Sequence, residues 1–418
     1  MSSPLPSLEQ LESLKSAIVK KRPYCSGTLR LPAENYLLFF AKGEDGHRLD
    51  FTNPDKVVLE ELAQACDIAT FGVNQQDTLD ESYRKAGKLD SQYFAPKFDL
   101  QRSGLVGLIQ DDLLEGPRAS NEIRAELYKL NVYGPGSFFK AHKDTPRSEK
   151  MFGSLVLILP TPHEGGSLVL RDNGNEWTFD SAKAVNGTDG PEIGYVIFYS
   201  DVEHEVTEVK SGYRVTLTYN LYFESPTAET KHKSLHGHGQ KLKEAFQNLL
   251  AETTFLPDGG NLGFGLHRQY PINLKEKSLQ YLLECLKGSD ATLYRVCQEL
   301  GLSAQFNLVY EERDESGAVL CNTLPVELEG AYVEMNLLTL IREEHGGKMI
   351  ERIDDYYDDD DSEEGGVDME VFWVTELSKL TKVKNNYIAY GNEPSIGYIY
   401  GYGCLVVKVG PFGKRETV

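Results

Sequence analysis

The sequence has few cysteines and no long apolar segment. Its 418 residues include six cysteines, none of them in a CxxC motif, so neither a zinc ribbon nor a disulfide framework is indicated. No apolar stretch approaches the roughly 20 residues that a membrane-spanning helix needs. The amino terminus lacks the basic-then-apolar layout of a signal peptide. We therefore expect no membrane partner, and a location in the cytoplasm or nucleus rather than secretion.

Positive charge is also scarce. The chain has 43 Lys and Arg against 64 Asp and Glu, a net charge of −21, and such a surface repels polyanions on average. We therefore expect no nucleic-acid partner. Eight of the acids lie in the segment 354–364, which we expect to be a solvated acidic loop because like charges repel. A docking patch for a basic partner and a binding segment for divalent cations are the alternatives.

The most informative feature is a set of candidate metal ligands. His142 and Asp144 are separated by one residue, and alternate side chains of a strand point to the same face, so both would enter one pocket. A second histidine, His204, follows further along the chain. Two histidines and one carboxylate leave one face of a metal open, as in non-haem Fe(II) oxygenases. Arg214 carries the planar fork that suits a carboxylate, so the set predicts iron, a dicarboxylic co-substrate and oxygen.

The context of these residues supports a metal site. A lone HxD pair is weak evidence, because a strand histidine is as often simply hydrogen-bonded in the protein interior. Here, however, the neighbouring segments have the length, the β-branched and aromatic content and the bounding glycines of short strands. Such strands, with turns between them, are typical of a double-stranded β-helix, or jelly roll. The segments are 153–162, 165–171, 194–206 and 212–223.

Residues from about 100 to 225 resemble the prolyl 4-hydroxylase-like branch of the Fe(II)/2-oxoglutarate dioxygenases. The resemblance is carried by Tyr133-x-x-Gly136 ahead of His142-x-Asp144, by the LPTPHEGGSLVLR strand pair, by the stretch from Phe198 to Val206, and by Arg214-x-Thr216. It implies that the catalytic residues His142, Asp144 and His204 bind the metal. It also implies that Arg214, with Thr216 and Tyr133, binds 2-oxoglutarate. One departure is the strand Leu-Val-Leu-Ile-Leu at 155–159, where some relatives place a tyrosine for the co-substrate.

The activity that the resemblance implies is hydroxylation of a prolyl or other side chain of a protein or peptide, with release of succinate and CO2. Fe(II), 2-oxoglutarate and O2 would be required, with ascorbate as a further candidate cofactor. The same chemistry on a small-molecule metabolite is one alternative, because a fold does not fix a substrate. A non-catalytic β-helix that serves as a binding or regulatory module is another, although an intact ligand set with Arg214 argues against it. Candidate lining residues of the substrate pocket are Lys143, Arg147, His163 and Arg171.

We expect an α+β chain with three parts. Residues 1–100 would form a helical and hairpin segment that packs on the barrel, with helices at 7–20, 54–69 and 78–91 and a hairpin of 25–31 with 35–41. Residues 101–225 would form the double-stranded β-helix catalytic domain. A polar linker at 224–240, whose histidines we interpret as solvated, would lead to a mixed α+β domain of unknown role at 240–418. Its expected helices lie at 240–251, 275–287 and 290–300, and its strands at 304–312, 369–377 and 397–410.

Overall fold

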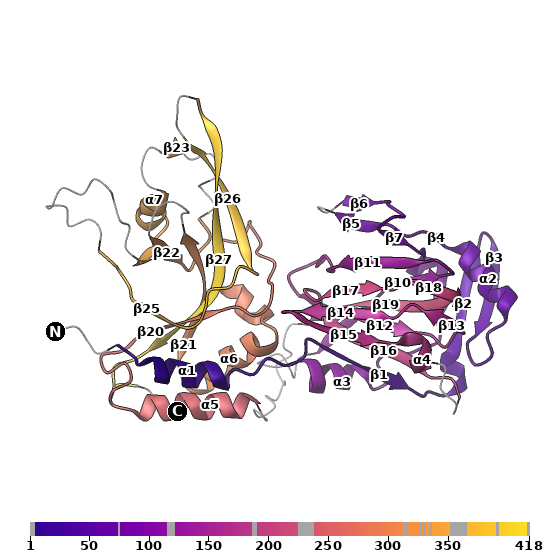
Figure 1. Cartoon of the computed structure of the whole chain (residues 1–418), viewed down its shortest axis with the longest axis horizontal. Helices are drawn as coiled ribbons and strands as arrows, with labels where there is room; N and C mark the ends of the chain where they lie inside the picture. The colour runs from indigo at the N-terminus through magenta and orange to yellow at the C-terminus, as the bar shows by residue number, and fades with distance from the viewer. Residues whose placement is uncertain are drawn as a thin grey trace. The chain divides into compact units, whose positions relative to one another are not determined.

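The computed structural model divides the chain into two compact units (Figure 1). The barrel unit consists of residues 22–114 and 119–230, and the C-terminal unit consists of residues 1–21, 115–118 and 231–418. The structure describes residues 5–73, 76–114, 122–185, 190–224, 238–311, 317–325, 328, 332–333, 337–351, 366–389 and 393–415. No helix among them is long and apolar enough to cross a membrane.

Two antiparallel sheets are the main layers of the barrel unit. The larger sheet has the strand order β1-β16-β12-β19-β10-β8-β4, and the smaller has the order β15-β14-β17-β11-β7. This arrangement agrees with the expected jelly roll. Their bounds are β1 Tyr24–Leu29, β4 Asp67–Ile68, β7 Arg84–Lys85, β8 Gly87–Asp90, β10 Ile123–Tyr133, β11 Phe138–His142, β12 Met151–Ile158, β14 Leu168–Asp172, β15 Asn175–Phe179, β16 Ile193–Tyr199, β17 Glu203–Val206 and β19 Arg214–Phe223.

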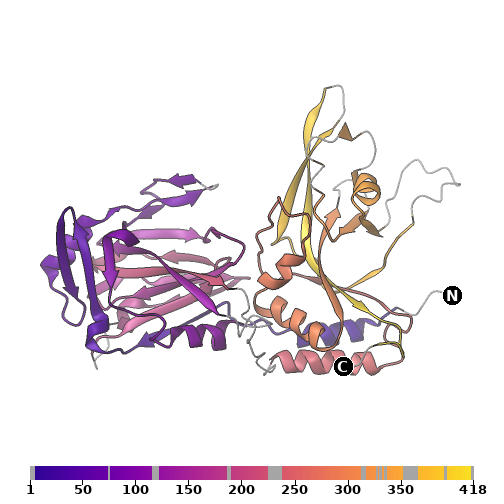
Figure 2. The same cartoon turned by 180° about the vertical axis from the view of Figure 1, so that it is seen from behind.

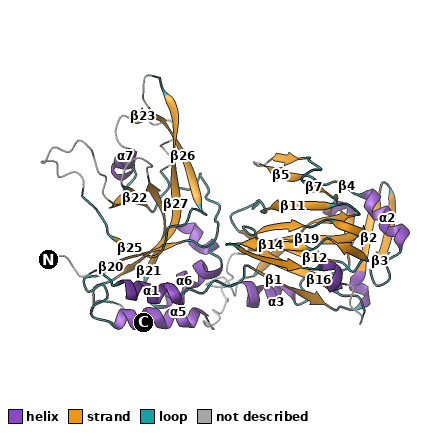
Figure 3. Ribbon diagram, viewed as in Figure 1, coloured by secondary structure: helices purple, strands orange, loops and turns teal. Residues whose placement is uncertain are grey.

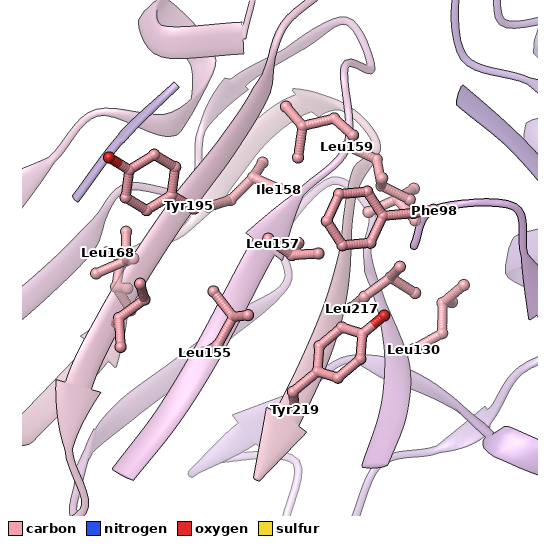
Figure 4. Close-up of a cluster of buried hydrophobic side chains, with 14 of the residues drawn as sticks. Phe98, Leu130, Leu155, Leu157, Ile158, Leu159, Leu168, Tyr195, Leu217 and Tyr219 are labelled. Carbon is pink, nitrogen blue, oxygen red and sulfur yellow. The ribbon is translucent and has the colours of Figure 1, made fainter. Parts of the chain in front are cut away.

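The core of this unit is built from apolar side chains that alternate along the central strands. Leu155 and Leu157 of β12 are fully buried, as is Leu217 of β19, and Figure 4 shows them within one cluster with Leu130 and Phe98. Because alternate residues of a strand face opposite ways, the residues on either side of Leu217 in β19 face the other side of the sheet. That other side carries the polar residues of the candidate site.

Shorter elements complete the barrel unit. Helix α2 confirms the helix expected at 54–69, and the Asp55 side chain caps its first turn by accepting hydrogen bonds from two backbone amides. Two short helical segments, α3 and η3, follow one another before β10. The remaining bounds are η1 Ala33–Tyr36, β2 Leu37–Lys42, β3 Asp45–Asp50, α2 Lys56–Ala65, β5 Phe71–Val73, β6 Gln76–Thr78, η2 Ser91–Tyr93, β9 Phe94–Pro96, α3 Leu105–Leu108, η3 Ile109–Leu113, β13 His163–Gly165, α4 Ser181–Val185 and β18 Val209–Gly212.

Three expectations for the first 100 residues are wrong. Segments 25–31 and 35–41 do not form a hairpin, because β1 pairs with β16 while β2 pairs with β3 and β9. Residues 78–91 are not a helix but include the short strands β7 and β8, and β8 pairs with β10. Helix α1, Leu8–Ala17, does not pack on the barrel, since Leu14 is buried in the C-terminal core with Leu242 and Phe246.

The C-terminal unit is mixed α+β. Its sheet has the order β23-β26-β27-β21-β22-β24, with β20 paired to β27 and β25, and helices α1, α5 and α6 lie together (Figure 3). The hairpin of β26 and β27 is the long yellow feature of Figure 2. The bounds are α5 His238–Ala251, β20 Gly260–Gly265, η5 Gln280–Cys285, α6 Gly288–Glu299, β21 Ser303–Glu311, β22 Ala318–Cys321, β23 Tyr332–Val333, α7 Leu337–Glu344, β24 Lys348–Glu351, β25 Val371–Thr375, β26 Lys382–Ala389 and β27 Ser395–Val409.

Most elements expected in this unit are present. Helix α5, helix α6 and strands β21, β25 and β27 occupy the expected places, whereas the helix expected at 275–287 is reduced to the short helix η5. The acidic segment 354–364 lies outside the described residues, as do His232 and His236 of the expected linker.

Candidate functional site

The three candidate metal ligands meet on the smaller sheet of the barrel unit. His142 is the last residue of β11 and lies directly opposite His204 of β17 in the strand register. Asp144 lies two residues after the end of β11, in the loop that follows the strand. The expectation that Asp144 lies within the strand is therefore wrong. One ligand atom from each of His142, Asp144 and His204 lies within 4.8 Å of the others. The sequence-predicted set is therefore brought together.

Hydrogen bonds fix which imidazole nitrogen faces the centre of this group. Nδ1 of His142 is 2.8 Å from the carbonyl oxygen of Lys140, and Nδ1 of His204 is 3.1 Å from that of Val202. A carbonyl can only accept, so each Nδ1 carries a proton and Nε2 is the ring nitrogen left for a metal ion. The Nε2 atom of His204 lies 3.8 Å from a carboxylate oxygen of Asp144. The backbone therefore orients both imidazoles in the way that supports metal-binding histidines.

The charge state of His142 suits a metal ligand. Burial and, to a lesser extent, the neighbouring His204 lower its pKa to about 2, although the hydrogen bond to Lys140 has the opposite effect. The imidazole is therefore neutral at physiological pH, and a metal ion does not compete with a proton for it.

Ser154 orients the carboxylate ligand. Its hydroxyl group, on β12, donates a hydrogen bond of 2.6 Å to one oxygen of Asp144, and the other oxygen is the one nearest His204. The serine thus fixes a side chain that stands in a loop. Sequence reasoning missed Ser154, since nothing in the spacing of residues 144 and 154 says that a loop folds back onto a strand.

One cavity of about 440 Å³ joins the candidate ligands to Arg214, Thr216 and Tyr133. Arg214 begins β19 and is 1 % exposed. Burial lowers its pKa to about 10, which leaves the guanidinium charged at neutral pH. Its Nε donates to the Ser181 hydroxyl at 3.3 Å, and its Nη2 has no hydrogen-bond partner among the described residues. A buried, charged and partly unpaired guanidinium calls for an anion.

The neighbours of Arg214 form a polar end of the cavity. Tyr133 of β10 is directly opposite Arg214 in the strand register, and the guanidinium carbon lies 5.4 Å from the centre of its ring. Thr216 follows on the same face of β19. Val156 of β12 also lines the cavity, which agrees with the expected absence of a hydroxyl group on the strand 155–159.

Of the four candidate lining residues, two line the cavity and two do not. Lys143 and Arg147 line the cavity. His163 is buried behind it, where its Nε2 is 3.1 Å from the same Ser181 hydroxyl that Arg214 contacts. Arg171 lies on β14 and forms ion pairs with glutamates of the surface, including Glu205 at 2.9 Å. Neither His163 nor Arg171 lines the cavity, so both expectations are wrong. His163 supports Arg214 indirectly, through the Ser181 hydroxyl.

Sequence reasoning also missed a second group of cavity residues. Arg84, Lys129, Asn131, Thr218 and Asn220 all line the cavity. A signal for two of them was present, since Arg214, Thr216, Thr218 and Asn220 alternate along one strand and must share a face. The other three come from neighbouring strands, whose register local sequence does not reveal.

Comparisons with known proteins agree with this geometry. Residues 128–222 match the model of the 2OG-Fe(II) oxygenase superfamily, and a comparison with curated protein sequences found no match. A prolyl-4-hydroxylase from Pseudomonas putida is 17% identical, with a TM-score of 0.29, and the alignment covers 51% of this chain and 100% of that one. A prolyl hydroxylase from Trichoplax adhaerens, solved with a peptide of hypoxia inducible factor, is 14% identical, with a TM-score of 0.32, and the alignment covers 52% of this chain and 92% of that one. We base the function on the family match and on the residues of the site.

Proposed function

We propose that this chain, a 2OG-Fe(II) oxygenase through its residues 128–222, hydroxylates a prolyl or other side chain of a protein or peptide and releases succinate and CO2. The chain is thus a dioxygenase of the prolyl 4-hydroxylase-like kind, and the superfamily implies Fe(II), 2-oxoglutarate and O2. The observation that carries the proposal is one cavity that holds two histidines, a carboxylate and a buried arginine with a donor that has no partner among the described residues. We also propose ascorbate as a reductant that keeps the iron ferrous.

The residues present fit an iron ion. His142, Asp144 and His204 would hold it, since two imidazoles and a carboxylate leave the remaining positions open. When bound, the iron supplies the activation of O2 that is coupled to decarboxylation of 2-oxoglutarate. The protein contributes a fixed tautomer at each histidine and a carboxylate that Ser154 holds in place. Such supporting hydrogen bonds commonly set metal affinity.

The residues also fit 2-oxoglutarate. Arg214 would bind one carboxylate of the co-substrate through its Nη2, which is buried and has no partner in the described part of the chain, and that contact would satisfy a donor that otherwise costs stability. Thr216 and Tyr133 would add hydroxyl contacts at the same end of the cavity. A non-catalytic module would have no need to keep a buried cation in this state.

The substrate and the cellular location belong to the proposal. The resemblance to the prolyl 4-hydroxylase-like pattern favours a side chain of a polypeptide over a small metabolite, which is the alternative. All six cysteines are free thiols, which suits a reducing compartment. A location in the cytoplasm or nucleus is part of the proposal.

Peptide oxidation tests this proposal. The protein is incubated in air with Fe(II), 2-oxoglutarate, ascorbate and a library of proline-centred peptides. We expect certain peptides to gain the mass of one oxygen atom while succinate forms in equal amount. His204→Ala should abolish both signals, whereas the control His47→Ala, which removes a histidine that pairs with Glu61 away from the cavity, should keep both. Succinate formation without any oxidised peptide would contradict a polypeptide substrate.

A further inference from the structure

The cavity is unusually basic for so acidic a chain. Asp144 is the one carboxylate that lines it among the described residues, and Asp144 is a candidate metal ligand. The net charge of the whole chain is nevertheless −21. The cationic residues of the lining are Arg84, Lys129, Lys143, Arg147 and Arg214. Only Arg214 is used by the proposed function, so the remaining cations require another explanation.

Arg84 is a buried cation with neutral partners. It is 5 % exposed and donates to the carbonyl of Thr70 at 2.6 Å and to the side chain of Asn131 at 2.8 Å. Its Nε has no partner in the described part of the chain. Its guanidinium carbon lies 4.4 Å from the ring centre of Phe139, which stacks on His142 with 3.5 Å between centroids. A fixed positive charge therefore stands one aromatic ring away from a candidate metal ligand.

Lys129 and Arg147 gather around the ring of Tyr128. The Lys129 ammonium lies 4.0 Å from the ring centre, the Arg147 guanidinium carbon lies 4.4 Å from it, and Arg147 also donates to the hydroxyl group. Burial lowers the pKa of Lys129 to about 7, and repulsion from Arg84, Lys88 and Arg147 acts in the same direction. These charges are thus close enough to repel one another. Holding them together costs stability unless an anion joins them.

The position of these cations separates them from the co-substrate end. On β10, Lys129 and Tyr133 are four residues apart, and their partners on β19 are Thr218 and Arg214. At about 3.3 Å per residue this is roughly 13 Å. A co-substrate with one carboxylate on Arg214 and its other end on the metal does not account for cations at the far end. Asn220, which is 4 % exposed, adds a side-chain nitrogen without a partner among the described residues.

We propose that Arg84, Lys129 and Arg147, together called the cationic wall, bind a carboxylate of an acidic polypeptide segment that carries the residue to be oxidised. The inference rests on the proposed function, since it names the substrate class of that same site. The wall supplies positive charge, and Arg84 and Asn220 each supply a donor that has no acceptor among the described residues. An acidic side chain supplies both the negative charge and the acceptors, whereas a basic peptide would be repelled.

Binding of labelled peptides tests the cationic wall without turnover. Three fluorescent decapeptides share a central proline flanked by glutamate, glutamine or lysine. Their binding is measured by anisotropy under anaerobic conditions to protein saturated with Fe(II) and 2-oxoglutarate. We expect the glutamate peptide to bind about tenfold or more tightly than the glutamine peptide at low ionic strength, as for hydrogen bonds to charged groups. The lysine peptide should bind most weakly.

Variants locate the binding site. Lys129→Met and Arg147→Met should each reduce the preference for glutamate, and together they should remove it. They are chosen because they are less buried than Arg84, and the co-substrate is titrated into each variant to show that the cavity is intact. Two controls remove an exposed positive charge elsewhere: Lys56→Met on α2 and Lys384→Met on β26, where the ammonium lies against Tyr398. Both controls should keep the full preference.

Several outcomes would overturn the inference. Equal affinity for the glutamate and glutamine peptides would do so, as would a preference that survives in the double variant. Displacement of the peptide by an equal concentration of free glutamate would show that the wall takes a small anion and no polypeptide. Failure of the proposed function looks different: the glutamate peptide would bind at the wall, yet no succinate or oxidised peptide would form in air.

Discussion

Single hydrogen bonds decide whether the three candidate ligands can act together. Asp144 stands in a loop, and a serine on a neighbouring strand holds it. The two histidines are oriented by backbone carbonyls, which no side-chain substitution removes. Ser154 is therefore the most accessible point at which to weaken the site without removing a ligand.

Ser154→Ala should lower metal affinity about 10- to 100-fold, the usual effect of losing a hydrogen bond to a ligand. Competition between the protein and a metal-sensitive dye, with Fe(II) or Mn(II), measures this. Ser211→Ala serves as the matched control, since that hydroxyl contacts the exposed Glu164. Unchanged affinity in Ser154→Ala would show that Asp144 holds its position without help or is no ligand.

Arg214→Ala should raise the 2-oxoglutarate requirement by about tenfold or more, because a hydrogen bond to a charged group contributes about 1.5–3 kcal/mol. Metal affinity, measured in the absence of the co-substrate, should change far less. A titration of 2-oxoglutarate against the rate of succinate formation gives the result. If the requirement is unchanged, another cation of the lining binds the co-substrate, and Lys143 and Arg147 are the next candidates.

The affinity for an acidic peptide should fall as pH rises. The pKa of Lys129 is lowered to about 7 by burial and by Arg84, Lys88 and Arg147, while Asp90 raises it. The ammonium is therefore charged below pH 7 and loses its charge above it, and a bound carboxylate shifts the midpoint upward. Lys129→Arg keeps the charge at every pH tested, so its affinity should stay nearly flat between pH 6 and about 9. A wild-type profile as flat as that of the variant would exclude a role for Lys129.

At the scale of elements, β19 forms one side of the cavity, because its alternate residues line it from the co-substrate end toward the metal ligands. The turn that precedes it depends on Gly212, whose backbone φ is +72° and whose position would bring a Cβ atom 2.1 Å from the carbonyl oxygen of Pro162. Neither the conformation nor the space suits another residue. The geometry of this turn therefore sets where Arg214 begins the strand.

Gly212→Ala should destabilise the barrel unit by more than the about 1–3 kcal/mol of backbone strain alone, and it should weaken 2-oxoglutarate binding. Gly174→Ala is the matched control: its φ is +78° but a Cβ atom there would meet nothing within 4 Å. Thermal unfolding of both variants separates strain from steric overlap. Equal losses in melting temperature would mean that the contact with Pro162 relaxes freely.

The elements also show how far the sequence could be interpreted. The strands that carry His204 and Arg214 were predictable, because β-branched and aromatic runs between glycines leave little choice. Residues 78–91 have the charged composition of an exposed helix, yet Arg84 and Leu89 are buried there, since pairing with distant strands overrides local propensity. The cationic wall could not be predicted from the sequence for the same reason, because Arg84 and Lys129 come from strands whose neighbours lie far away in the sequence.

At the scale of the whole molecule, net charge and local charge have opposite signs. The chain as a whole is strongly acidic, whereas its cavity is basic. An acidic peptide would be repelled at long range and held at short range, and salt screens exposed charges more than partly buried ones. Affinity for such a peptide should therefore fall with salt concentration less steeply than it would for the same number of fully exposed cations.

Deleting the acidic segment 354–364 should leave thermal stability and turnover of 2-oxoglutarate unchanged, since eight acids among its residues cannot form a core. The rate of substrate hydroxylation is then compared for the wild type and the deletion variant at low and high ionic strength. Equal activities support a solvated loop, and a loss confined to low salt supports recruitment of a basic partner. A melting temperature lowered by several degrees would contradict both interpretations.

The central claim is that His142, Asp144, His204 and Arg214 form one site for iron and 2-oxoglutarate. Its most direct test is the visible charge-transfer band that appears when 2-oxoglutarate is added to the anaerobic Fe(II) protein. We predict the band for the wild-type protein and its complete loss in His142→Ala, because that variant removes a metal ligand. A His142→Ala protein that keeps the band and full affinity for iron would contradict the claim.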